Sequence, residues 1–172
     1  MLDNYFQNTL TGDKIGSLLL EKLGEALWSE QALVEMLPAF AKASFSMELT
    51  STFDLYAAQT EEHIARLDKI FTKIGLAPQL RATELSTLLV SAGKVIDGLE
   101  KQSPERDIAL IKAAKRITSY QIAFYEWLGN IAQSNDSQEI KDLIQNIVHQ
   151  EQERLHILLR LEASFKSVNA GT

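Results

Sequence analysis

Apolar residues recur every three to four positions through most of this chain, and that spacing is the period of an α-helix. The pattern runs through four long segments, at about 13–43, 46–75, 103–133 and 136–166, and through a shorter one at about 85–99. No stretch alternates apolar and polar residues for long between turn signals, so the sequence predicts no β-strand. The period therefore restricts the chain to an all-α fold.

Residues typical of helix ends separate these segments. Gly75 suits a left-handed C-cap, and Thr83 suits the N-cap of the shorter helix. Ser103 followed by Pro104 is a typical helix start, and Asp136, with an acid three residues later, matches a capping box. Two helical hairpins joined by one long connection form the ferritin-like arrangement. We therefore predict a ferritin-like four-helix bundle with a shorter extra helix in the crossover between long helices two and three.

The length of 172 residues suits a single domain. We expect residues 13–166 to form the helical-bundle domain. Residues 1–12 have no sustained period and are expected to form a short N-terminal arm, and residues 167–172 a frayed tail.

Composition excludes several classes of function. With 17 Lys and Arg against 23 Asp and Glu, the net charge of -6 argues against a nucleic acid or an anionic membrane as partner. The chain has no cysteine, which excludes disulfides, iron–sulfur clusters, thiolate zinc sites and cysteine nucleophiles. The first residues do not resemble a signal peptide, and no run is long and uncharged enough to span a bilayer. We expect a cytoplasmic protein.

Polar residues interrupt the apolar face of each long helix. Glu30 lies in the middle of the stripe on its helix, between Leu27 and Val34, so an acid points into the core. Each residue of a helix is rotated by about 100° from the one before it, so the direction of every polar side chain can be compared with that of the apolar stripe. Three more polar residues lie near the centre of their stripes, namely Thr60, Gln121 and Glu151. His63 lies slightly to one side of its stripe, and Gln59 lies at the edge. A buried carboxylate must be paired, protonated or bound to a metal. These side chains are therefore candidates for one shared site.

Di-iron and di-manganese carboxylate bundles use a Glu from each of two helices and a Glu-x-x-His from each of the other two. This chain matches the scheme in part, because Thr60 stands three residues before His63 and Gln121 is neutral. The literal Glu-x-x-His of Glu153 and His156 does not qualify, since both residues point away from the apolar stripe.

Three stretches resemble the YciE/YciF-type ferritin-like proteins in order and spacing. They are Trp28-Ser29-Glu30-Gln31-Ala32-Leu33, Gln59-Thr60-Glu61-Glu62-His63-Ile64-Ala65-Arg66-Leu67 with Ile70-Phe71, and Tyr120-Gln121-Ile122-Ala123-Phe124-Tyr125. The resemblance covers about residues 11–165. It implies a bacterial cytoplasmic protein associated with stress responses, a bundle that tends to dimerise, and a dinuclear metal site. The family's acids on the first and last helices correspond to Glu30 and Glu151, whereas Gln59 and Gln121 align with two further acids.

Two functions from different classes follow. In the first, the protein is a non-catalytic structural or interaction protein, a homodimer serving a stress assembly, with a depleted metal site in its core. In the alternative, it is a metal-binding redox or iron-handling protein. Its metal ligands would then be Glu30, His63 and Glu151, with Gln59 and Gln121 as weak or supporting groups, holding iron or manganese.

The core also has a metal-free interpretation, in which the inward acids join a hydrogen-bonded polar layer. Gln59, Gln121, Tyr56 or Tyr125 would supply the partners. Protonated His63 paired with Glu30 or Glu151 needs no metal, whereas two facing acids without a cation would share a proton. The expected cofactor is accordingly none, or a weakly held iron or manganese ion, and the sequence leaves open whether the protein is an enzyme.

Overall fold

The computed structural model describes residues 14–98 and 103–170 as five helices. They are α2 (Lys14–Ala43), α3 (Met47–Ile74), α4 (Leu85–Gly98), α5 (Pro104–Ser134) and α6 (Gln138–Ala170). The described residues contain no strand, and four of the helices are long while α4 is short. The predicted all-α bundle with a shorter helix in the crossover is thus confirmed. The predicted arm at 1–12 lies outside the described residues, and α6 continues to Ala170, into the predicted tail.

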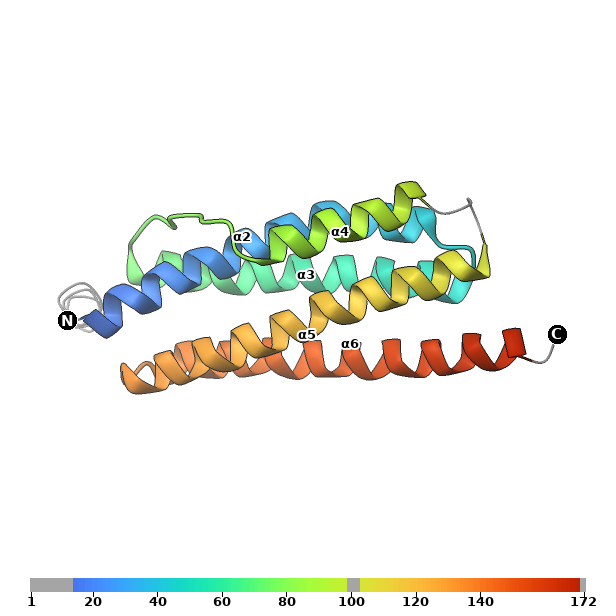
Figure 1. Ribbon diagram of the computed structural model, residues 1–172. Coiled ribbons are helices and arrows are strands. Elements are labelled where there is room, and N and C mark those ends of the chain that lie inside the picture. The colour runs from blue at the N-terminus through green and yellow to red at the C-terminus, as the bar shows by residue number, and fades with distance from the viewer. Residues whose placement is uncertain (1–13, 99–102, 171–172) are drawn as a thin grey trace.

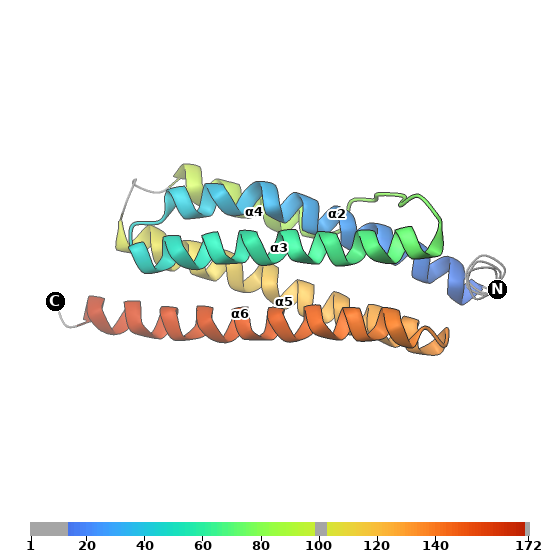
Figure 2. The same cartoon turned by 180° about the vertical axis from the view of Figure 1, so that it is seen from behind.

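Two antiparallel hairpins make up the bundle, one of α2 with α3 and the other of α5 with α6 (Figure 1). The helix α4 lies against α2 and α5, and α6 runs alongside α3 (Figure 2). Each hairpin closes through a short turn, whereas the hairpins themselves are joined through α4 and the connections on either side of it. This arrangement brings one face of all four long helices to a common centre.

Side-chain and backbone caps fix several helix ends. The hydroxyl of Ser46 accepts a bond from the backbone N–H of Leu49 (3.0 Å), and the hydroxyl of Ser103 does the same at the start of α5. Gly75 ends α3 with φ of 73°, a left-handed conformation that glycine adopts without strain. The prediction for Asp136 is wrong. Its φ is 51°, whereas an N-cap residue is extended, and the carbonyl of Ser137 begins the α6 bonds instead.

The apolar core divides into two clusters along the bundle axis. One cluster packs around the following side chains: Leu33, Phe40, Leu49, Phe53, Tyr56, Leu110, Ile117 and Leu158. The other packs around the following: Leu19, Leu23, Leu27, Leu67, Ile70, Tyr125, Leu128 and Ile147. On every long helix the inward polar residue falls between the two clusters in sequence. The bundle therefore has one buried polar layer at mid-length.

The connection between α3 and α4 lies directly on α2. A Cβ atom added to Gly24 would stand 2.1 Å from the backbone oxygen of Gln79, well inside contact distance. The hydroxyls of Ser29 and Thr83 are also within hydrogen-bond distance, at 3.3 Å. Only glycine at position 24 lets the connection approach so closely. This contact positions the start of α4 beside the polar layer.

Candidate functional site in the bundle core

The structure brings the inward residues of all four long helices together at the centre of the bundle. Glu30, His63 and Gln121 are fully buried, and Glu151 is 1% exposed. Gln59, which the sequence places at the edge of its stripe, is half-buried at the margin of the same layer. Glu153 and His156 lie on the surface, as their helical positions predict. The layer therefore contains two buried acids, each of which needs compensating partners.

Three donors surround the carboxylate of Glu30. One oxygen accepts from the hydroxyl of Tyr125 (2.6 Å) and the side-chain amide of Gln121 (3.0 Å). The other lies 3.3 Å from Nδ1 of His63. Burial alone would raise the pKa of this carboxyl, but the bond and charge of His63, together with the Tyr125 bond, hold the pKa below 4.5. Glu30 is therefore an ionised carboxylate at neutral pH.

The second acid, Glu151, is neutralised by an arginine on its own helix. Nη1 of Arg154 lies 2.6 Å from Oε1 of Glu151, and Arg154 is 4% exposed. Burial raises the pKa of Glu151 to about 7 although Arg154 lowers it, and the charge of Glu30 also raises it. Glu151 thus depends on the guanidinium for its ionised form.

Arg154 makes further contacts that hold it across the gap between α6 and α3. Its Nε donates to Oε1 of Gln59 (2.9 Å), and Nη2 donates to Oγ1 of Thr60 (3.2 Å) and to the carbonyl of Tyr56 (3.0 Å). The guanidinium carbon also lies 5.0 Å from the centre of the Tyr56 ring. The guanidinium is therefore anchored on α3 by three hydrogen bonds and an aromatic face.

Sequence reasoning missed Arg154. The signal was available, because a residue three positions after Glu151 lies on the same face of a helix and can pair with it. Arg154 stands between Glu153 and His156, two residues that do point outward.

Oxygen atoms on two other helices surround the ring of His63. Nε2 lies 2.9 Å from Oε1 of Gln150, and the same oxygen accepts a bond from Nη1 of Arg66 (2.7 Å). Since arginine can only donate, the Gln150 atom is an acceptor and Nε2 of His63 must carry a proton. Nδ1 faces Glu30 at 3.3 Å and Glu151 at 3.8 Å, so both ring nitrogens lie against acceptor oxygens. His63 and Arg154 thus face the two acids in a closed layer.

The side chains of the polar layer do not meet the needs of a dinuclear metal centre. Metal ligation requires an unprotonated imidazole nitrogen and free carboxylate or amide oxygens. Here Gln59 and one oxygen of Glu151 bind Arg154, and both nitrogens of His63 face acceptors. Within residues 14–98 and 103–170, no group of three His, Asp or Glu side chains is placed to hold an ion. The residues present do not fit a dinuclear centre. One atom is left over, since Oε1 of Gln121 is buried without a hydrogen-bond partner.

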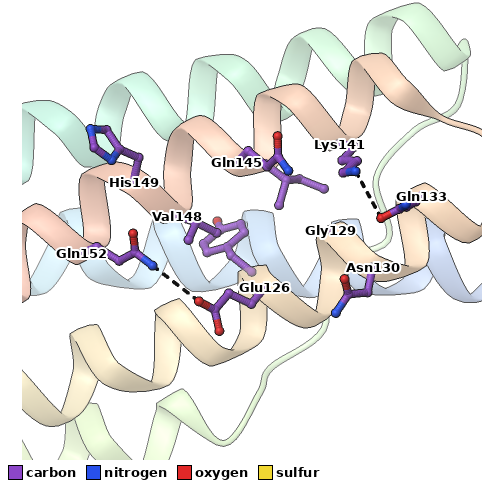
Figure 3. A pocket seen from close by; sticks show the side chains of 11 residues that line it. Glu126, Gly129, Asn130, Gln133, Lys141, Gln145, Val148, His149 and Gln152 are labelled. Carbon is purple, nitrogen blue, oxygen red and sulfur yellow. Dashed lines mark hydrogen bonds between the residues drawn. The ribbon is translucent and has the colours of Figure 1, made fainter.

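A groove lies between α5 and α6 (Figure 3). It has a volume of about 430 Å³, and the ring of Tyr125 forms part of its lining. Lys141 donates to Gln133 across the groove, and Gln152 approaches Glu126 at 3.5 Å. Tyr125 also donates to Glu30, so this residue contributes both to the groove and to the buried polar layer.

Comparisons with known proteins agree on the fold. A profile of the family described as "Domain of unknown function (DUF892)" matches residues 14–167. The chain is 24% identical to "Protein YciF" of Escherichia coli (strain K12) over 139 residues, covering 80% of this chain and 83% of that protein. The crystal structure of the E. coli stress protein YciF superimposes with a TM-score of 0.85 at 24% identity, covering 90% of this chain and 98% of the other.

A second solved structure is that of "YcfI, a putative structural protein" from Rhodopseudomonas palustris. It matches with a TM-score of 0.80 at 22% identity, covering 85% of this chain and 93% of the other. At these identities the structural matches establish the fold. In addition, no helix of the described chain has the length and apolarity needed to cross a membrane.

Proposed function

We propose that this chain, which belongs to the DUF892 family, is a non-catalytic structural protein. The family agrees with the predicted YciE/YciF-type relationship. In this proposal the helical bundle is the functional unit, and its polar core holds the helices together without a metal. The R. palustris relative, whose description suggests a structural role, is consistent with the proposal.

The observation that carries the proposal is the position of Arg154. Its guanidinium lies 2.6 Å from Glu151 and is bonded to Gln59, two residues that a family metal site would use as ligands. A bound guanidinium supplies the positive charge that a second metal ion would bring, and it repels any cation placed beside it. Nδ1 of His63 lies beside Glu30 in the same way, at 3.3 Å. The buried acids thus have their compensating partners among the chain's own side chains.

The biological setting is inferred from the relatives. The E. coli protein of similar fold is a stress protein, and we place this chain in the same setting as a cytoplasmic homodimer that serves a stress-related assembly. No nucleic-acid or membrane partner is part of this proposal, in keeping with the net charge of -6. The proposed dimer is tested by sedimentation equilibrium of the full chain over a range of concentrations.

Metal analysis tests the structural role most directly. The protein is expressed with added iron or manganese, dialysed against a chelator, and measured by elemental analysis and thermal unfolding. We expect well under one ion per chain and the same melting temperature before and after chelation. An Arg154→Met variant treated in the same way shows whether removing the guanidinium opens the site to metal. About one retained ion per wild-type chain, with a lower melting temperature after chelation, would refute the proposal.

One observation favours the alternative of a metal-binding protein. Nδ1 of His63 lies 3.3 Å from Glu30 and 3.8 Å from Glu151, and the unpartnered oxygen of Gln121 belongs to the same layer. A single iron or manganese ion held by these residues would have to displace any proton on Nδ1 of His63. The alternative therefore predicts that metal uptake releases protons and is lost in a His63→Gln variant. Titration calorimetry in two buffers of different ionisation enthalpy measures that proton release.

A further inference from the structure

A second groove, separate from the one in Figure 3, lies between α2, the connection before α4, and α5. It has a volume of about 670 Å³, and three aromatic side chains of α5 line it: Tyr120, Phe124 and Trp127. We call it the aromatic groove. The rings of Tyr120 and Phe124 are stacked at 6.2 Å, and those of Phe124 and Trp127 meet at 6.3 Å. Trp127 is 44% exposed, so this aromatic surface is open to a ligand.

A cation already lies against this surface. Nζ of Lys22 is 5.6 Å from the centre of the Trp127 ring, a distance at which the ring quadrupole attracts positive charge. The same ammonium is bonded to Glu25 at 2.7 Å and lies 3.4 Å from Glu21. These acids raise the pKa of Lys22, chiefly through the Glu25 hydrogen bond. The groove therefore combines aromatic faces with carboxylates around a positive charge.

The other charged residue lining the groove is an acid, Glu84, at the start of α4. A helix start can bind an anion through its free N–H groups. Here the hydroxyl of Thr83 accepts from the N–H of Leu85 (3.2 Å), and the carbonyl of Thr83 accepts from the N–H of Ser86 (3.0 Å). With these donors occupied and Glu84 beside them, the groove disfavours an anionic ligand.

We propose that the aromatic groove binds a flat aromatic cation. Its ring system would stack on the face of Trp127 and meet Phe124 at an angle, because the two ring planes are inclined at 60°. Its charge would lie toward Glu84, since Glu25 is already paired with Lys22. Such a ligand repeats the arrangement that Lys22 makes with Trp127, and the groove volume falls in the range of ordinary small-molecule sites. The net charge of -6 also favours the approach of a cation. The proposal does not depend on the structural role proposed above.

Dye titration of the full chain tests this site. Thioflavin T is the flat aromatic cation, and the anilinonaphthalene sulfonate dye is an aromatic anion of similar size. Two variants remove the two parts of the site: Trp127→Leu removes an exposed ring, and Glu84→Gln removes a charge. The matched controls are Phe45→Leu, an exposed aromatic elsewhere, and Glu61→Gln, an exposed acid on α3. Circular dichroism confirms that each variant keeps the wild-type helix content.

We expect saturable binding of thioflavin T, weakened about tenfold or more by Trp127→Leu and several-fold by Glu84→Gln, with both controls unchanged. The anionic dye should bind at least tenfold more weakly to the wild type. Absence of saturable thioflavin T binding, equal binding of the anionic dye, or unchanged affinity in Trp127→Leu each overturns the proposal. It is also overturned if Trp127→Leu dissociates a dimer that thioflavin T does not disturb, because the groove is then covered by a second copy of the chain.

Discussion

Replacing Arg154 by methionine is the sharpest perturbation of the core. Methionine keeps most of the side-chain length and its apolar stem but removes the charge that lies 2.6 Å from Glu151. The three bonds to Gln59, Thr60 and the carbonyl of Tyr56 are lost with it. Glu151, at 1% exposure, is then a buried acid without its main partner.

The expected loss of stability comes mainly from the broken ion pair, and part of it depends on pH. Removing one member of a buried ion pair costs about 3–5 kcal/mol in the free energy of unfolding. Part of this cost depends on pH, because Glu151 already has a pKa of about 7 with Arg154 present, against 4.5 for the unfolded chain. Without Arg154 that pKa moves higher still, and Glu151 becomes protonated at neutral pH.

The sign of the pH effect follows from linkage. A carboxyl whose pKa is higher in the folded state stabilises the fold below its unfolded value of 4.5, and this contribution is lost as pH rises through the folded pKa. The loss caused by Arg154→Met should therefore be about 1–2 kcal/mol larger at pH 8 than at pH 5. Urea unfolding followed by far-ultraviolet circular dichroism at the two pH values measures the difference.

Two further variants make the test specific. Arg160→Met removes an exposed arginine from the same helix and should change stability by less than about 0.5 kcal/mol. Adding Glu151→Gln to Arg154→Met removes both charges of the pair and should recover part of the loss, mainly at pH 8. A loss below about 1 kcal/mol, or one equal at both pH values, would show that the guanidinium does not neutralise Glu151.

Three other predictions follow from the same geometry. Tyr125→Phe removes the 2.6 Å bond to ionised Glu30 and should cost about 1.5–3 kcal/mol in urea unfolding; a change near zero would mean that the bond contributes little. Gly24→Ala places a Cβ 2.1 Å from the Gln79 oxygen and should lower stability by about 1–3 kcal/mol, whereas Gly93→Ala, with open space around it, should raise stability by about 0.5–1 kcal/mol. Equal melting shifts for the two glycine variants would contradict that contact. Because the pKa of Glu30 is lowered, its stabilisation is complete above pH 4.5 and is lost as pH falls through the folded pKa. Glu30→Gln should therefore reduce the acid sensitivity expected below pH 4.5, and an unchanged acid midpoint would argue against an ionised Glu30.

Helical periodicity was sufficient to predict that three of the polar residues face the core. Glu30, Gln121 and Glu151 each sit at a position fixed by 3.6 residues per turn, and all three are buried where the pattern places them. The same reasoning correctly placed Glu153 and His156 outside. These predictions succeed because they depend only on the geometry within one helix.

Predictions that depend on contact between helices were less complete. Arg154 on α6 bonds to Gln59 and Tyr56 on α3. These bonds depend on the distance between the two helices, which the sequence pattern of α6 alone does not predict. In the same way, the proton on Nε2 of His63 is assigned from its contact with Gln150 of α6, which also accepts a bond from Arg66 of α3. Long polar side chains reach the core from positions at its margin, so their contribution is visible only once the helices are packed.

Confinement of the buried charges to a single level has a consequence for how the two hairpins align. Sliding one hairpin along the other by one helical turn, about 5.4 Å, would bring Glu30 opposite Ile117 and Gln121, or opposite Tyr125 and Leu128, so Glu30 would lose one of its two partners on α5. A layer of leucine side chains would tolerate that slip, whereas a buried carboxylate that loses hydrogen-bond partners would not. The layer thus selects one register at some expense of stability, as single polar positions do in coiled coils. An all-apolar version of the layer should keep its helix content but give broadened, poorly dispersed NMR spectra, because several registers would then coexist.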